Sequence, residues 1–127
     1  PSRIMALPSN METGLRAEEA AARFLLSEGF RLLHRNWRSG RYELDIVAER
    51  DGVLHIVEVK CRRDGGLTMP EEAMTRAKFR SLFRAAERYI ALYGLDMDTQ
   101  FDLISVLYDA GGECRLQYIP EVMTPHW

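Results

Sequence analysis

Apolar residues recur every three or four positions in two stretches of the chain, which predicts two amphipathic helices. The first stretch covers residues 13–28 and is followed by Gly29, a residue that commonly ends a helix. The second covers residues 68–93, opens with a capping-box pattern formed by Thr68 and Glu71, and is also followed by a glycine. The apolar stripe of the first helix comprises Ala17, Ala20, Ala21, Phe24 and Leu25.

Shorter runs rich in β-branched and aromatic residues predict strands. The second and third runs flank Asp51-Gly52, a dipeptide typical of a two-residue hairpin turn. The last two runs predict a second hairpin, which Pro120 ends. The strands are predicted at residues 30–33, 42–48, 53–59, 101–108 and 114–119. The order αβββαββ indicates an α/β fold, in which a mixed β-sheet is flanked by helices.

The size of the chain fits one core. With 127 residues and 46% hydrophobic content, we expect a single domain at 13–120, between a flexible N-terminal tail at 1–12 and a C-terminal tail at 121–127. No apolar run approaches the roughly 18 residues that a membrane-spanning helix needs. Two cysteines without metal-binding spacing predict a reduced, cytoplasmic protein.

The first hairpin gathers charged residues. Counting back from the turn at Asp51-Gly52 places Asp45 opposite Glu58 and Glu43 opposite Lys60. Because side chains alternate along each strand, these four residues are predicted to share one face of the sheet. Carboxylates that face each other across two strands repel, and a divalent cation between them would relieve that repulsion.

Hard oxygen ligands of this kind suit Mg²⁺ or Mn²⁺. We expect the side chains of Asp45 and Glu58, with the backbone carbonyl of Val59, to bind the ion, and Lys60 to position the attacking water. This combination fits phosphodiester hydrolysis. The alternative is that Glu43 and Lys60 form an ordinary ion pair, while the sheet's twist separates the other two carboxylates on a solvated face.

Cations and an aromatic residue surround the hairpin, a composition suited to nucleic-acid phosphates and bases. Residues 31–94 contain 13 Lys or Arg against 9 Asp or Glu, so the net charge of −2 conceals a basic middle. Trp37 fits packing at the core edge equally well, and the other cations of the second helix fit a solvated face. The predicted nucleic-acid contacts are Trp37, Arg38, Arg41, Arg62, Arg63 and Lys78.

The hairpin resembles the PD-(D/E)XK nuclease superfamily, in which an Asp on one strand precedes Glu-x-Lys on the next, here Asp45 and Glu58-Val59-Lys60. More narrowly, the chain is similar to the YraN family of small bacterial proteins. It departs from that family's pattern at Ala17 and Tyr42, where glycine is usual. The matching segments are Gly14–Glu18, Asn36-Trp37-Arg38, Tyr42–Val47, Val57–Arg62 and Phe101–Ile104.

The resemblance implies a restriction-endonuclease-like core, Mg²⁺ or Mn²⁺ as the cofactor, and DNA as the partner. It also implies a third metal-binding carboxylate, Glu18, as in related Holliday-junction resolvases; from the residues alone, Glu18 is a first-turn acid favoured by the helix dipole. The expected function is a metal-dependent nuclease that hydrolyses DNA phosphodiester bonds, with branched DNA as a candidate substrate. The expected catalytic residues are Asp45, Glu58, Lys60, Glu43 and Glu18.

Two further expectations follow from the same comparison. One is a homodimer, because resolvase-like relatives cut two strands. The other is an alternative function: a non-catalytic module that keeps the nuclease fold and binds nucleic acid or protein. Binding of Mg²⁺ or Mn²⁺ to the folded protein distinguishes this module from the enzyme.

Overall fold

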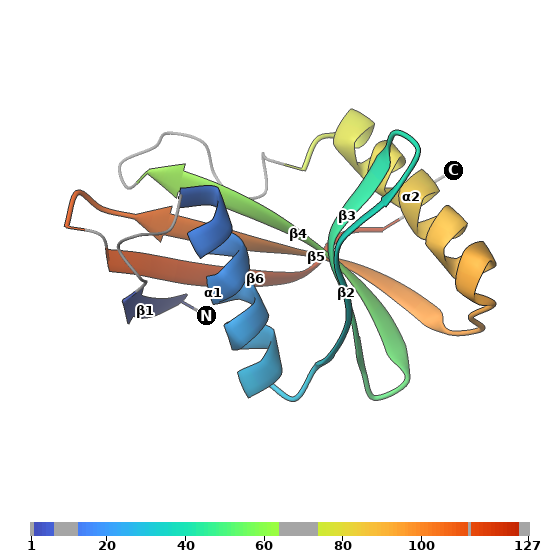
Figure 1. The fold of residues 1–127 in the computed structure, drawn as a ribbon, viewed down its shortest axis with the longest axis horizontal. Coiled ribbons are helices and arrows are strands. Elements are labelled where there is room, and N and C mark those ends of the chain that lie inside the picture. The colour runs from blue at the N-terminus through green and yellow to red at the C-terminus, as the bar shows by residue number, and fades with distance from the viewer. Residues whose placement is uncertain (1, 7–12, 64–73, 112, 125–127) are drawn as a thin grey trace.

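A six-stranded sheet with one helix packed on each face forms the protein (Figure 1). The computed structural model describes residues 2–6, 13–63, 74–111 and 113–124. The elements are β1 (Ser2–Ala6), α1 (Thr13–Ser27), β2 (Arg31–Ser39), β3 (Tyr42–Arg50), β4 (Val53–Arg63), α2 (Arg76–Tyr93), β5 (Asp98–Tyr108) and β6 (Glu113–Met123). From α1 onward this is the predicted order αβββαββ, which is confirmed.

The strands lie side by side in the order β1-β6-β5-β4-β3-β2. Only β4 and β5 run parallel among the pairs of the described sheet, and α2 makes the crossover between them. The predicted turn at Asp51-Gly52 joins β3 to β4, and both residues have the positive φ that such a tight turn requires, 54° and 79°. Neither described helix is long and apolar enough to cross a membrane.

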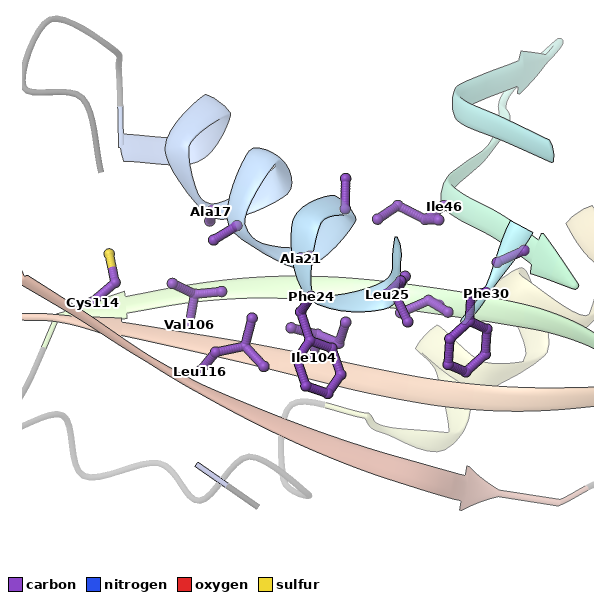
Figure 2. Close-up of a cluster of buried hydrophobic side chains, with 14 residues drawn as sticks. Ala17, Ala21, Phe24, Leu25, Phe30, Ile46, Ile104, Val106, Cys114 and Leu116 are labelled. Atoms are coloured by element: carbon purple, nitrogen blue, oxygen red, sulfur yellow. The ribbon is translucent and has the colours of Figure 1, made fainter. Parts of the chain in front are cut away.

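Alternating side chains divide the core between the two faces of the sheet. On one face, α1 packs its predicted stripe of alanines with Phe24 and Leu25 against β4, β5 and β6, as Figure 2 shows for Ile104, Val106 and Leu116. On the other face, α2 packs over β3 and β4. Its buried residues are Phe79, Leu82, Ala85, Ala86 and Tyr89. The central strands are therefore covered on both sides.

A buried aspartate ties β6 to the centre of the sheet. Asp102 on β5 is fully buried, and its carboxylate accepts hydrogen bonds from the Tyr118 hydroxyl (2.7 Å) and the Glu121 backbone N–H (3.0 Å). It also lies 2.7 Å from His55 Nδ1 and accepts from the Gln100 amide at 2.9 Å. This group lies on the α1 face of the sheet, away from Glu58.

The two ends of the domain differ from the prediction. The segment assigned to a flexible tail contains β1, which pairs antiparallel with the outer edge of β6. A five-residue strand gives little sequence signal, because backbone pairing with a neighbour rather than its own pattern stabilises it. Pro120 does not end β6, which continues to Met123. The proline lies at an irregularity of the β5–β6 pairing, next to Glu121 with φ 48°, where no ladder hydrogen bond is lost.

The beginning of α2 was also predicted wrongly. The helix begins at Arg76, and Thr75 is its N-cap, with its hydroxyl accepting from the Lys78 backbone N–H at 3.1 Å. Thr68 and Glu71, the predicted capping box, lie outside the described residues. The predicted end at Gly94 is confirmed, since this residue caps the helix with φ 62°.

Candidate functional site

The candidate site lies where β3 and β4 separate. The predicted register is confirmed from Arg50↔Val53 to Ile46↔Val57, and the pairing ends there. The expected cross-strand pairs of Asp45 with Glu58 and of Glu43 with Lys60 do not form in this ladder. The Asp45 carboxylate reaches across the gap instead and accepts the Val59 backbone N–H at 2.8 Å. The Asp45 side chain thus takes the place of a backbone acceptor for Val59 where β3 and β4 separate.

The neighbouring strand is irregular at the same level. Asn36 on β2 has φ 52°, a left-handed conformation that asparagine tolerates better than most residues. On β3, Leu44 and Val47 both pack in the α2-side core although they are three positions apart. Regular alternation would place them on opposite faces, so the alternation slips around Asp45. This local slip is what turns the Asp45 side chain toward the gap.

Asp45 and Glu58 form a repulsive carboxyl pair. The Glu58 side chain is only 5% exposed. Burial, together with the negative charge of Glu58, raises the pKa of Asp45 to about 7, although the hydrogen bond from the Val59 N–H acts in the opposite direction. The charged form of Asp45 is therefore disfavoured, and a perturbed carboxyl pKa of this kind marks a candidate functional site.

Two lysines neutralise the buried acid. Lys60 Nζ lies 3.5 Å from Glu58 Oε2, and Lys78 Nζ lies 3.0 Å from the same oxygen. Lys60 follows Glu58 by two positions on β4, whereas Lys78 reaches the site from the first turn of α2. Burial alone would lower the pKa of Lys78, but the charge of Glu58, a hydrogen bond to it and the charge of Asp45 raise it.

Glu18 approaches the site from the opposite helix, α1. Its negative charge contributes to the raised pKa of Asp45, which places the two groups within electrostatic reach. The Glu18 Oε1 atom is buried and has no hydrogen-bond partner among the described residues. A buried oxygen in this state is unusual and is available to bind a ligand. The site thus receives side chains from both helices and both separating strands.

The oxygen donors fit a hard divalent cation. Among the described residues, no three His, Cys, Asp or Glu side chains are arranged as a ready-made metal cluster. Mg²⁺ does not require one, since it is commonly bound by one or two carboxylates and keeps several waters. The two carboxylates of Asp45 and Glu58 are a donor pair of that kind, and the Glu18 carboxylate lies within electrostatic reach of Asp45.

The remaining predicted site residues lie outside this group. Glu43 does not support Lys60 as expected; its ion pair is with Arg38, at 3.4 Å on the surface. Trp37 is 6% exposed and packs edge-on against Tyr89, so of its two predicted roles the structure shows the core role. The side chain of Arg63 lies outside the described residues. Arg62 is partly buried.

A basic surface joins Arg41, one of the predicted nucleic-acid contacts, to two arginines of α2 that the sequence assigned to a solvated face. At the end of the β2–β3 hairpin, Tyr42 lies between two guanidinium groups, those of Arg41 at 5.3 Å and Arg88 at 5.9 Å from its ring centre. Arg88 Nε donates to Ser39 Oγ at 2.7 Å, and Arg84 acts electrostatically on Tyr42. We call Arg41, Arg84 and Arg88 the hairpin–helix surface. No sequence signal joined α2 to the hairpin, because the residues are more than forty positions apart.

Comparison with known proteins gives a consistent family. Residues 17–106 match the model of the uncharacterised protein family UPF0102. A UPF0102 protein of Bacteroides thetaiotaomicron is 40% identical over 90% of this chain and 93% of its own length. One from Porphyromonas gingivalis is 41% identical over 82% of this chain and 77% of its own. The matched region contains most of α1, the hairpin and α2, and every residue of the candidate site lies within it.

Proposed function

The chain belongs to the uncharacterised protein family UPF0102, as the predicted YraN-type resemblance indicated, and we propose that it is a metal-dependent nuclease of the PD-(D/E)XK type acting on DNA. The observation that carries the proposal is the convergence of Asp45 and Glu58 with two lysines where β3 leaves β4. A buried carboxyl pair beside ammonium groups is suited to bringing a cation and a phosphate together.

Each residue has a separate role in this proposal. Asp45, Glu58 and the Val59 carbonyl would hold Mg²⁺ or Mn²⁺, with Glu18 beside them. When bound, such an ion lowers the pKa of a coordinated water and stabilises charge on the leaving oxygen. Lys60 would orient the attacking water and neutralise charge on the phosphate. The restriction-endonuclease-like core and a preference for branched DNA belong to the same proposal.

A non-catalytic nucleic-acid-binding module is the second candidate. One observation favours it: both lysines already neutralise Glu58, so the described protein is balanced without a metal ion. Under that reading the site is a structural remnant, and the basic residues alone bind nucleic acid. The two candidates differ in whether a divalent cation stabilises the folded chain.

Thermal melting in the presence of metal tests the proposal. Titrating Mn²⁺ or Mg²⁺ is expected to raise the Tm of the wild type, because an ion that binds only the folded state stabilises it by roughly 2.7 kcal/mol at a hundred times its Kd. Glu58→Gln is expected to abolish most of the rise, whereas Glu28→Gln, in the turn that follows α1, retains it. No Tm shift at millimolar metal would favour the non-catalytic module.

The hairpin–helix surface is expected to bind the DNA backbone. Arg84→Glu with Arg88→Glu should weaken binding of a fluorescent DNA duplex in EDTA, where cleavage is absent. Each lost phosphate contact should also reduce the salt dependence of binding by a slope of about 1. Fluorescence anisotropy over a salt series measures both effects.

A charge-matched double variant tests whether the loss of DNA affinity is specific to the hairpin–helix surface. Arg23→Glu with Arg31→Glu makes the same change in net charge on residues paired with Glu19 and Glu49, away from this surface. Equal losses of affinity in the two double variants would show a general charge effect and contradict a specific surface.

A further inference from the structure

Lys78 and Lys60 approach Glu58 in different ways. Both ammonium groups lie near the same oxygen, Oε2, but Lys78 is the closer, at 3.0 Å against 3.5 Å. Lys60 is fixed on the same strand as Glu58. Lys78 belongs to a different layer of the fold, so its contact with Glu58 exists only because α2 is docked on the sheet.

The position of Lys78 is well determined by its helix. It is the third residue of α2, and its backbone N–H is held by the N-cap hydroxyl of Thr75. The next residue, Phe79, is buried and packs edge-on against Phe101 on β5 with ring centres 4.9 Å apart. The side chains of Lys78 and Lys60 are each 35% exposed, so either has a solvent-side path by which to leave Glu58 without backbone movement.

An ammonium group and a divalent cation compete for Glu58 Oε2. A salt bridge at 3.0 Å occupies one direction of approach to an oxygen that is otherwise almost fully buried. A cation bound by Asp45 and Glu58 takes over the neutralisation that Lys78 provides, and two positive groups at one carboxylate repel each other. The proposed function keeps Lys60 beside the attacking water, so Lys78 is the lysine that can yield.

We propose that Lys78 is the resident counter-ion of Glu58, that a divalent cation displaces its ammonium group, and that the displaced group then contacts a DNA phosphate. This inference rests on the proposed function and deepens it by linking metal loading to DNA binding. Because such coupling is reciprocal, DNA must raise metal affinity by the same factor as metal raises DNA affinity. In the metal-free protein, Lys78 is engaged with Glu58 and contributes little to DNA binding.

The first test measures metal binding without DNA. In Lys78→Met the competing ammonium is absent, so the apparent Kd for Mn²⁺, measured from the Tm shift, is expected to fall by roughly three- to tenfold, about 1.4 kcal/mol at the upper end. Arg80→Met removes an exposed cation two positions along α2 and should leave the Kd for Mn²⁺ unchanged. A Kd that rises or stays constant in Lys78→Met overturns the counter-ion role.

The second test measures DNA binding with and without metal. For a four-way DNA junction, Ca²⁺ is expected to strengthen wild-type binding relative to EDTA, and Lys78→Met is expected to lose most of that gain while matching the wild type in EDTA. Lys78→Arg, which keeps the charge, should recover much of it. Equal loss of affinity in Ca²⁺ and EDTA would show an ordinary phosphate contact and overturn the coupling.

The two proposals fail in different ways. If Mn²⁺ stabilises the wild type and Glu58→Gln removes that effect, the metal site stands, and an unchanged Kd in Lys78→Met overturns only the present inference. If Mn²⁺ does not stabilise the wild type, both the metal site and the displacement of Lys78 are overturned. Urea unfolding of Lys78→Met in EDTA confirms that the variant is folded before either comparison.

Discussion

Asp45→Asn is expected to abolish magnesium-dependent DNA cleavage and, in the absence of metal, to make the protein more stable. The carboxylate is a proposed ligand, so its loss should lower the cleavage rate by on the order of a thousandfold, about 4 kcal/mol of activation free energy. The asparagine carbonyl can still accept the Val59 N–H that the carboxylate accepts at 2.8 Å. Cleavage of linear, nicked and branched DNA under single-turnover conditions measures the loss.

The gain in stability has an electrostatic cause. Burial and the charge of Glu58 raise the pKa of Asp45 to about 7, so ionising Asp45 in the folded protein opposes folding. Replacing it with a neutral amide should stabilise the metal-free protein at pH 8 by on the order of 1–2 kcal/mol. Urea unfolding in EDTA measures this.

The same shift predicts a dependence on pH. The folded chain binds a proton at Asp45 more tightly than the unfolded chain, in which the pKa of an aspartate is about 3.9. Wild-type stability in EDTA should therefore decrease as the pH rises from about 4 to about 7, and Asp45→Asn should lack this component. Undiminished cleavage by Asp45→Asn would contradict the metal assignment, and lower stability at pH 8 would contradict the electrostatic account.

Asp102→Asn is expected to cause the largest loss of stability. An amide oxygen accepts fewer hydrogen bonds than a carboxylate, and the amide NH₂ would face groups that donate, among them the Tyr118 hydroxyl and the Glu121 N–H. Leaving such donors buried without partners should cost roughly 3–5 kcal/mol of the free energy of unfolding. Tyr118→Phe removes one of these bonds and should cost only about 1 kcal/mol. Urea unfolding at pH 7 measures both.

The pH dependence of Asp102 has the opposite sign to that of Asp45. Burial alone would raise its pKa, but the hydrogen bonds from His55, the Glu121 N–H, Tyr118 and Gln100 together lower it. Its contribution is therefore complete above the aspartate's unfolded-state pKa and is lost as the pH falls through its lower folded-state pKa. Asp102→Asn should unfold less steeply with acid than the wild type. Equal stability of Asp102→Asn and the wild type at pH 7 would show that the network is dispensable.

Local patterns predicted most of the secondary structure. The apolar stripe of α1, the Asp51-Gly52 turn and the capping glycine Gly94 each depend on residues close in sequence, and all three are confirmed. β1 was missed because its partner, β6, lies at the other end of the chain. The beginning of α2 was missed because the Thr68–Glu71 pattern was taken as the cap, whereas Thr75 caps the helix in the structure.

The site was predicted in composition but not in geometry. Counting positions from the turn assumes an unbroken ladder, and that assumption fails beyond Ile46 and Val57. The pattern alone did not reveal the slip at Asp45, which lies level with the positive φ of Asn36 on the adjacent strand. The contact of Lys78 with Glu58 depends on how α2 docks, which is a tertiary property. Sequence spacing therefore predicted which charged residues lie near one another, but the contacts that each of them makes depend on the three-dimensional fold.

Beyond the point where β3 and β4 separate, the hairpin formed by β2 and β3 is no longer paired with β4. This end of the hairpin is attached to α2 instead, through Trp37 against Tyr89 and through Ser39 bonded to Arg88. The same helix packs on the central strand β5 through Phe79 against Phe101 and contacts Glu58 through Lys78. α2 therefore fixes the unpaired end of the hairpin relative to the carboxylate site, and loosening of the helix would disturb both at once.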